Sequence, residues 1–407
     1  MDKLINKTPL VRFPEFKDDW REFRLSELMS RVSKNNKDEE FSVKEILSLS
    51  STQGIVDRKE LLGDTYDKVN HKNYIKTRLN DLVYGKSISA SYPYGLFKVN
   101  NCRDGLLSTL YFTFKVNDNE TPAFLDRYFS NHNRANNFLK KYVLVGDRYI
   151  TADANYILSG KIYIPQKNEQ KKITAFLSTL EKKIEQLKQK LYLLEEYKKG
   201  VMQQLFTNKL RFKDENGKDY ADWEEKKLGD LGVFKGGGTP STEISEYWNG
   251  DIPWISSSDL IENDISNINV TRFITEKAIS ESATKLIPVN SVLFISRVGV
   301  GKLAVSKRIM CTSQDFANFI PNEIDSFYLA YYFMVNNNLL RSYAQGTSIK
   351  GFTSGDLKSI KISCPVLEEQ QKIANFLSAI DDKINHCQLQ ITNTEIWKKG
   401  LLQQMFV

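Results

Sequence analysis

The chain has few of the residues from which metal centres, disulfide frameworks and membrane spans are built. Its 407 residues include only four cysteines and three histidines. No two cysteines form a CxxC pair, and the histidines never approach metal-ligand spacing. No apolar run comes near the roughly 18 residues that a membrane span requires, and the amino-terminal residues lack an apolar signal core. We therefore expect reduced thiols, no bound metal and a cytoplasmic location.

A large excess of charge of one sign is also lacking. The 57 Lys and Arg residues face 50 Asp and Glu residues, which gives a formal net charge of +7. This excess favours a polyanionic partner but is far below that of a histone-like surface. The length and the hydrophobic content of 41% predict a multidomain globular protein with two or three cores.

Motifs for catalysis are absent or incomplete. Residues 234–238 satisfy the FxGxG pattern of amino-methyltransferase cofactor loops, but the Asn/Asp-Pro-Pro-Tyr/Phe motif of adenine methylation occurs nowhere in the chain. YGKSIS (84–89) and GVGK (299–302) lack the first glycine of a phosphate-binding loop. No GxSxG or HExxH motif is present. We expect a non-catalytic chain without a cofactor of its own, although the dispersed carboxylates leave a nuclease cluster open.

The chain does contain an internal repeat. Residues 161–206 align without a gap on residues 361–406, with 19 identities in 46 positions. In both copies the apolar residues alternate at spacings of four and three, which is the heptad pattern of a coiled coil. The two seams share one phase and can pair. Their polar members Lys198, Thr394 and Lys398 are expected to fix the register.

The repeat divides the chain into four parts. Segments 1–160 and 208–360 are rich in short β-type runs and are expected to fold as related mixed α/β domains, followed by helices at 161–207 and 361–407. NKLRF (208–212) resembles NKTPLVRF (6–13), so the repeat behaves as if it were circular. The predicted fold class is α+β: two mixed α/β domains joined by two long antiparallel coiled-coil helices, with a pseudo-two-fold internal repeat.

This symmetry has a consequence for the partner. Duplex DNA has two-fold axes perpendicular to its length, so two related domains engage it equivalently when a similar axis relates them. Helices related by such an axis run antiparallel and would hold the domains at a fixed distance. Because the domains differ in sequence more than the helices do, we predict a bipartite, non-palindromic target with an unread spacer.

The paired motifs EQKKITAFLS (169–178) and EQQKIANFLS (369–378), and KKGVMQQLF (198–206) and KKGLLQQMF (398–406), resemble the specificity subunits of type I restriction-modification systems. FKGGGTPSTEISEYWNGDIPWISSSDL (234–260) is similar to the opening of many target-recognition domains in that family. Residues 30–62 of the first domain lack its GxTPS and IPWI elements, so that domain resembles a different subtype.

The resemblance implies two target-recognition domains that read separate half-sites of double-stranded DNA. It also implies helices that recruit two modification subunits, which methylate adenine with S-adenosylmethionine, and then two restriction subunits, which cleave DNA using ATP and Mg. The chain itself would be non-catalytic. Two alternatives stay open: a stand-alone DNA methyltransferase, and a coiled-coil interaction protein without a DNA role.

Base edges are read by Arg, Lys, Asn, Gln and small hydroxyl side chains on exposed loops, and basic residues hold phosphates. Segments 146–151 and 346–351 occupy matching repeat positions, which favours both as DNA-facing loops. In the first domain the DNA-binding candidates are Lys86, Ser87, Ser89, Tyr92, Arg103, Arg148, Tyr149 and Thr151. In the second domain they are Lys235, Thr239, Ser256, Ser257, Ser258, Arg297, Lys302, Lys307, Arg308, Thr347, Ser348 and Lys350. The partner-binding candidates are Gln203, Gln204, Phe206, Gln403, Gln404 and Phe406.

Overall fold

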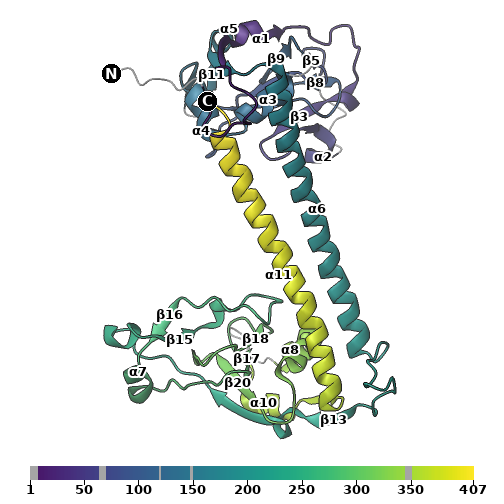
Figure 1. Ribbon diagram of the computed structural model, residues 1–407, viewed down its shortest axis with the longest axis vertical. Helices are drawn as coiled ribbons and strands as arrows, with labels where there is room; N and C mark the ends of the chain where they lie inside the picture. Colours follow the sequence, from purple (N-terminus) through teal and green to yellow (C-terminus); the bar gives the residue numbers. More distant parts are fainter. Residues whose placement is uncertain (1–7, 64–69, 119–120, 147–149, 344–350) are drawn as a thin grey trace. The chain divides into compact units, whose positions relative to one another are not determined.

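In the computed structural model the chain forms two compact units, and both long helices run through both units. Unit 1 consists of Met1–Lys188 and Leu389–Val407, and unit 2 consists of Gln189–Gln388. Helices α6 (Lys167–Phe206) and α11 (Leu367–Gln404) each contribute one segment to either unit (Figure 1). We call the residues before α6 the first domain and those between α6 and α11 the second domain. The structure describes residues 8–63, 70–118, 121–146, 150–343 and 351–407.

A four-stranded antiparallel sheet forms the centre of the first domain, in the order β2-β9-β6-β7. Its strands are β2 (Met29–Val32), β9 (Tyr111–Val116), β6 (Leu82–Gly85) and β7 (Leu96–Val99). Successive side chains of a strand point to opposite faces, and here both faces are covered. Leu82 and Tyr84 join the main core, whereas Val83 joins a smaller cluster with Leu47 and Ile55. The continuous apolar run of β6 is thus explained by burial on two sides.

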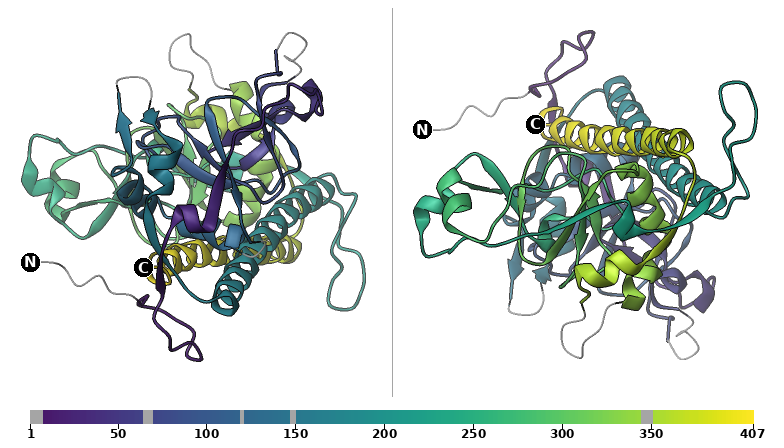
Figure 2. Two further views of the ribbon diagram at one scale, coloured as in Figure 1. Left: turned by 90° about the horizontal axis from the view of Figure 1, so that it is seen from above. Right: turned by 90° about the horizontal axis from the view of Figure 1, so that it is seen from below.

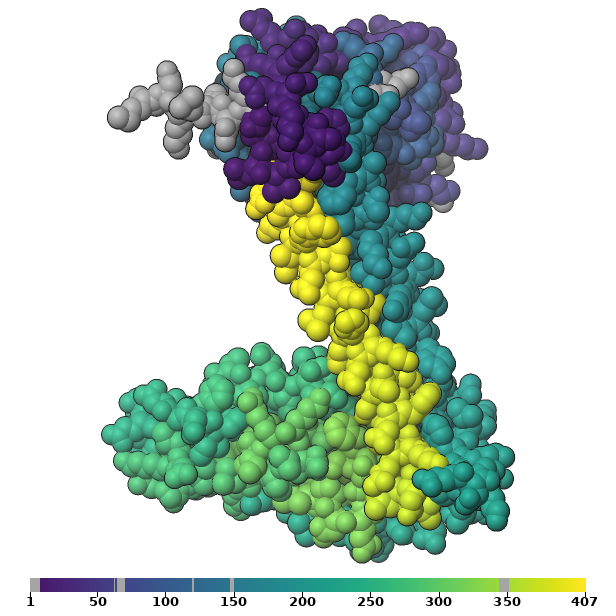
Figure 3. Space-filling model, in the orientation of Figure 1, coloured from purple at the N-terminus to yellow at the C-terminus, as the bar shows by residue number. Residues whose placement is uncertain are grey.

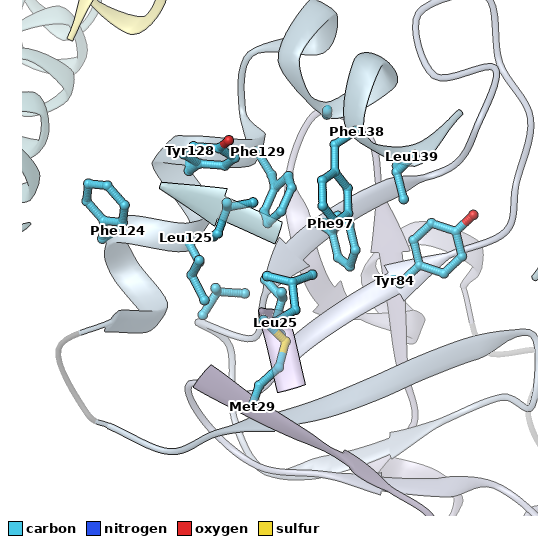
Figure 4. Packing of buried hydrophobic residues seen from close by; sticks show 14 of the residues in the cluster. Leu25, Met29, Tyr84, Phe97, Phe124, Leu125, Tyr128, Phe129, Phe138 and Leu139 are labelled. Atoms are coloured by element: carbon cyan, nitrogen blue, oxygen red, sulfur yellow. The ribbon is translucent and has the colours of Figure 1, made fainter. Parts of the chain in front are cut away.

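The main core of the first domain is built by two helices that pack on this sheet. Helices α3 (Thr121–Phe129) and α4 (His132–Leu139) supply its large aromatic side chains. Figure 4 shows Phe129 and Phe138 gathered around Phe97, with Leu25 and Met29 in the same cluster. The ring centroids of Phe97 and Phe129 are 4.5 Å apart. Aromatic packing of this extent fixes α3 and α4 on the sheet.

The other strands of the first domain form two-stranded pairs. These are β1 (Arg21–Arg24) with β12 (Lys161–Ile164), β3 (Leu47–Ser50) with β4 (Gly54–Asp57), β5 (Ile75–Thr77) with β8 (Gly105–Leu107), and β10 (Val143–Val145) with β11 (Ile150–Ala152). Short helices connect them: α1 (Leu25–Leu28), α2 (Arg58–Leu62) and α5 (Ala154–Leu158).

The second domain repeats this architecture with a different sequence. Its central sheet has the order β14-β20-β17-β18, which matches β2-β9-β6-β7 strand for strand. The strands are β14 (Gly232–Gly236), β20 (Phe316–Pro321), β17 (Val292–Ile295) and β18 (Leu303–Val305). β13 (Glu224–Lys227) pairs with β21 (Lys361–Cys364) as β1 pairs with β12. The shared strand order confirms the prediction that the two domains are related.

Beside this sheet the second domain has a three-stranded sheet in the order β16-β15-β19. Its strands are β15 (Ile252–Ile255), β16 (Arg272–Ile274) and β19 (Cys311–Thr312), and β15 and β19 run parallel. The helices of this domain are α7 (Glu276–Glu281), α8 (Ser326–Val335), α9 (Asn337–Tyr343) and α10 (Ser354–Ser359). In the described ranges, no helix combines the length and the apolar character that crossing a membrane would need.

Within each unit, a segment of α6 lies beside an antiparallel segment of α11 (Figure 2). In unit 1, Lys398 Nζ lies 2.6 Å from Glu181 Oε1. In unit 2, Lys198 Nζ lies 2.5 Å from Asp381 Oδ1. These two ion pairs occupy equivalent positions of the repeat. Each seam lysine therefore has a carboxylate partner on the facing helix, as a role in fixing the register requires.

A cluster of one arginine, one tryptophan and one glutamate holds the start of each long helix. In unit 1, Arg12 donates two hydrogen bonds to Glu169, from Nε to Oε1 at 2.6 Å and from Nη2 to Oε2 at 2.7 Å. Trp20 Nε1 donates to Glu169 Oε1 at 3.2 Å. Glu169 is 0% exposed, so these three hydrogen bonds replace its contact with water. We call this cluster the glutamate clamp.

Unit 2 contains the same clamp around Glu369. Arg211 donates to both of its carboxylate oxygens, at 3.2 and 2.8 Å, and Trp223 Nε1 donates to Oε2 at 3.2 Å. In both units the residue after the arginine also packs on its helix: the ring centroids lie 5.6 Å apart for Phe13 and Phe176. Phe212 and Phe376 repeat this contact at 5.5 Å. The circular character predicted for the repeat is confirmed.

The amino-terminal segment is also attached to the last turn of α11. Val11 N donates to Gln404 O at 3.0 Å, and Figure 3 shows the first described residues (purple) packed against the end of α11 (yellow). Leu210 N donates to Gln204 O at 3.2 Å in unit 2. Each domain is therefore joined to the start of one long helix and to the end of the other.

Candidate nucleic-acid interface

Several polar loops meet at one edge of the second domain. Because β15 and β19 run parallel, their carboxyl ends reach the same edge. Ser313 N donates to Ile255 O at 2.8 Å, which brings the loop after β19 beside the Ser256–Ser258 turn that follows β15. Ser258 and Gln314 are exposed there. We call this region the second polar edge.

The loop that joins β17 to β18 reaches the same edge. Ser296 N donates to Asp315 O at 2.7 Å, and Arg297, the next residue, is exposed. Lys302 Nζ donates to Leu260 O at 3.3 Å, and the hydroxyl of Thr239 donates to the Gln314 side chain. The structure therefore brings together six of the predicted residues of the second domain: Thr239, Ser256, Ser257, Ser258, Arg297 and Lys302.

The corresponding edge of the first domain lies where β6 ends. Gly85 pairs with Tyr111 at the start of β9, and the following residues Ser87 and Ser89 are exposed. Lys86 Nζ lies 4.0 Å from the ring centroid of Phe112. We call this region the first polar edge. It presents hydroxyl groups and a cation, the groups that bind phosphates and base edges.

The comparison with known proteins fits this geometry. The family model described as type I restriction modification DNA specificity domain matches the chain twice, over residues 17–196 and 220–393. The chain belongs to this family. Each polar edge is thus part of a specificity domain, and the fold of each specificity domain is the repeated sheet described above.

Two relatives come from Methanocaldococcus jannaschii. The chain is 39% identical over 208 residues to the type I restriction enzyme MjaIX specificity subunit, a match that covers 49% of this chain and 48% of the relative. It is 27% identical over 298 residues to the putative type I restriction enzyme MjaX specificity subunit, covering 71% and 68%. The chain thus spans about half the length of the first of these relatives.

The fold is shared with a solved structure, the type I restriction-modification system S subunit from M. genitalium. The TM-score is 0.59 at 15% identity, and the match covers 98% of this chain and 99% of the other. At this identity the likeness establishes the fold alone. It confirms the predicted fold class.

Other predicted residues of the specificity domains lie away from the polar edges. Lys307 and Arg308 are exposed in the turn after β18. This turn lies beside the start of β17, whereas Arg297 follows the end of β17. Lys235 Nζ donates to Leu286 O at 3.0 Å. Arg103 precedes β8, and its Nη2 lies 2.5 Å from Asp57 Oδ2. Thr151 is exposed on β11.

Two aromatic candidates are corrected by their burial. Tyr92 is only 6% exposed, and its hydroxyl lies 2.8 Å from His132 Nε2, so the prediction that it reads DNA is wrong. Phe406 is 5% exposed and packs on Phe124 with ring centroids 5.3 Å apart, so the prediction that it contacts a partner is wrong. Phe206 is half-buried, with its ring centroid 5.5 Å from that of Tyr328. Aromatic residues at these positions close the domain cores instead.

The remaining candidates are exposed or undescribed. The partner-binding candidates Gln203, Gln204, Gln403 and Gln404 are exposed at the ends of the long helices. Five DNA-binding candidates lie outside the described residues: Arg148, Tyr149, Thr347, Ser348 and Lys350.

The glycine run of the second domain is explained by close packing of the backbone. Gly238 N donates to Thr312 O at 2.8 Å. A Cβ atom on Gly237 would lie 2.0 Å from Ser313 O, and one on Gly238 would lie 2.5 Å from the Ala283 carbonyl carbon. Only glycine allows these approaches. The N–H of Gly238 is thus already paired inside the domain.

Sequence reasoning missed Arg272, which also lies at the second polar edge. It begins β16 opposite Trp254, and its guanidinium carbon lies 4.6 Å from the ring centroid of Trp254. Its Nη2 donates to Ser256 Oγ at 2.7 Å and to Asp259 Oδ2. The side chain is 38% exposed, so this oriented guanidinium still reaches solvent. No spacing in the sequence connects Arg272 to Ser256, because strand pairing alone brings them together.

Among the described residues, no group of three or more His, Cys, Asp or Glu side chains is arranged to hold a metal ion. None of Cys102, Cys311, Cys364 and Cys387 forms a disulfide in the described structure.

Proposed function

We propose that this chain is the DNA-reading subunit of a type I restriction-modification complex, and that its two domains read different half-sites of one asymmetric target. The observation that carries the proposal is a repeated scaffold with unlike polar edges. The central sheets correspond strand for strand. A spacer between the half-sites would contact neither polar edge.

The difference between the edges lies at equivalent positions of the sheets. The residue after β6 is Lys86, whereas the residue after β17 is Ser296. The second polar edge holds the oriented Arg272, in a sheet whose first-domain counterpart is the hairpin β3–β4. Unlike donors favour unlike bases, so the two half-sites would differ in sequence.

We also propose that the exposed surfaces of α6 and α11 bind modification subunits, which methylate adenine with S-adenosylmethionine. Restriction subunits that use ATP and Mg would complete the complex, and this chain would contribute no catalytic group. Large apolar side chains that are 53–64% exposed support a binding role for the helices: Tyr192, Leu193, Tyr197, Leu389, Ile396 and Trp397. Three of these side chains lie within six residues on α6 and three within nine residues on α11, so each helix exposes several large apolar groups within about two turns.

The first experiment is sequencing of modified bases in DNA from a host that lacks other modification systems and expresses this chain with its cognate modification subunit. We expect N6-methyladenine in one bipartite motif. Exchange of the first domain should change one half of the motif, and exchange of the second domain should change the other. A stable complex that leaves DNA unmethylated would contradict the proposal, and binding of S-adenosylmethionine by the isolated chain would favour a methyltransferase instead.

A single substitution can test the second half-site. Arg272→Gln should weaken binding to the motif by about 1–3 kcal/mol and relax the second half-site only, because it removes an oriented guanidinium from that edge. Arg308→Gln removes the same charge from the remote turn after β18 and serves as the control. Equilibrium binding to duplexes with single base changes in either half-site measures both effects. Equal losses in the two variants would mean that Arg272 acts only through its charge.

A further inference from the structure

Two cations lie over one aromatic ring at the first polar edge. Lys86 Nζ is 4.0 Å and the guanidinium carbon of Arg31 is 5.1 Å from the ring centroid of Phe112. The three residues belong to different parts of the sheet: Arg31 lies on β2, Phe112 lies on β9, and Lys86 directly follows β6. Arg31 is exposed and Lys86 is half-buried, so the space beside them is open to a ligand.

Neither cation has an acidic partner among the residues that the structure describes. Two other basic residues of this domain, Lys76 and Arg103, are paired with carboxylates. The buried Lys76 lies 2.5 Å from Asp38 and 2.7 Å from Glu40, and Arg103 is bound to Asp57. Burial and the nearby charge of Arg31 both lower the pKa of Lys86. Two like charges beside one ring repel each other, and a bound anion removes this cost.

We propose that Arg31, Lys86 and Phe112 form an anion site that binds one backbone phosphate of the DNA beside the first half-site. The proposal rests on the DNA-reading function proposed above. Lysine offers a compact charge and arginine a planar fork of donors, and both groups bind phosphate oxygens. Phe112, which is largely buried, forms an apolar floor that limits water around the contact and so strengthens it. The exposed Ser87 and Ser89 follow Lys86, and the Ser89 hydroxyl, which accepts from Tyr92 N at 3.2 Å, can still donate to a base.

The second domain has no such site at the equivalent positions. The pairing of the strands aligns Arg31 with Phe234, Phe112 with Ala317 and Lys86 with Ser296. None of these three counterparts is charged. The phosphate contact therefore belongs to the first domain alone and would make the backbone contacts of the two half-sites unequal.

The salt dependence of DNA binding tests the proposal, because each phosphate that a protein neutralises contributes about −0.9 to the slope of log Kobs against log salt concentration. The complex of this chain with its modification subunit would be titrated with a duplex that carries the methylated motif. The variant Arg31→Gln/Lys86→Gln should reduce the steepness of this slope by about one phosphate equivalent. The recognised motif should stay the same, since a phosphate contact carries no base information.

Three variants control this experiment. Lys161→Gln removes an exposed charge on β12 that is paired with Glu22, and should leave the slope unchanged. Arg31→Lys and Lys86→Arg keep both charges and should retain the slope of the parent. A double glutamine variant with the parent slope overturns the anion site, and so does a changed first half-site, which would mean base reading. A parent complex that does not bind the duplex instead overturns the proposed function itself.

Discussion

Arg12→Ala should destabilise unit 1 by roughly 3–5 kcal/mol, because it leaves the carboxylate of Glu169 buried without its ionic partner. Glu169 is completely buried, and Arg12 supplies two of its three hydrogen bonds from the protein. The hydrogen bond with Glu169 raises the pKa of Arg12, so the arginine is charged at neutral pH. Calorimetric unfolding of the full chain measures the loss, and hydrogen exchange assigns it to unit 1.

Two variants make this expectation specific to the glutamate clamp. Arg21→Ala removes an exposed arginine of β1 and should change the free energy of unfolding by no more than about 0.5 kcal/mol. Arg12→Met/Glu169→Gln removes the charge from both positions and lets the amide oxygen accept from Trp20 Nε1, so it should regain most of the lost stability. If Arg12→Ala were as mild as Arg21→Ala, the clamp would contribute little to stability.

The helices and their repeat could be predicted from the sequence because their signal is local and periodic. The seam positions Leu177, Leu187 and Leu377 are buried as the heptad pattern predicts. The relation between the domains was also visible, since Trp20 and Trp223 recur at matching places before their sheets. Strand order itself was beyond the sequence, because short strands such as β6 pair with partners about 30 residues away.

The glutamate clamps illustrate what local reasoning cannot supply. Position 169 lies in the first helical turn, where an acidic residue suits the helix dipole, and that reading gives no reason for burial. Burial follows from Arg12, which is 157 positions away. The same limit applies to the polar edges. Arg31 and Arg272 are placed by aromatic residues on neighbouring strands, which the sequence does not reveal. Tyr92 is a residue type that could contact DNA, but the fold buries it.

Two equivalent ion pairs join α6 to α11: Lys198 with Asp381 in unit 2, and Lys398 with Glu181 in unit 1. Removal of the carboxylate should cost more stability in unit 2 than in unit 1. Asp381→Ala in unit 2 should cost about 3 kcal/mol or more. It leaves Lys198, which is buried, without its carboxylate 2.5 Å away. It also removes the closer of the two partners of the fully buried Tyr331, whose hydroxyl donates to Asp381 Oδ2 at 2.6 Å and lies 3.3 Å from Ser378 Oγ. Burial and the charge of Asp381 both raise the pKa of Tyr331, so the phenol stays protonated and needs an acceptor.

Glu181→Ala is the equivalent change in unit 1 and should cost only about 1 kcal/mol. Its partner Lys398 is half-buried and can reach water. Arg127 occupies the position equivalent to Tyr331 and also pairs with Glu181. It retains a second ion pair, in which its Nη1 lies 3.2 Å from Asp126 Oδ2. Unfolding of both single variants, with hydrogen exchange of each helix segment as the local probe, compares the two ion pairs directly. Adding Lys198→Met to Asp381→Ala removes the unpaired charge and should restore part of the stability. Equal costs of Asp381→Ala and Glu181→Ala would mean that burial does not set the contribution of these ion pairs to stability.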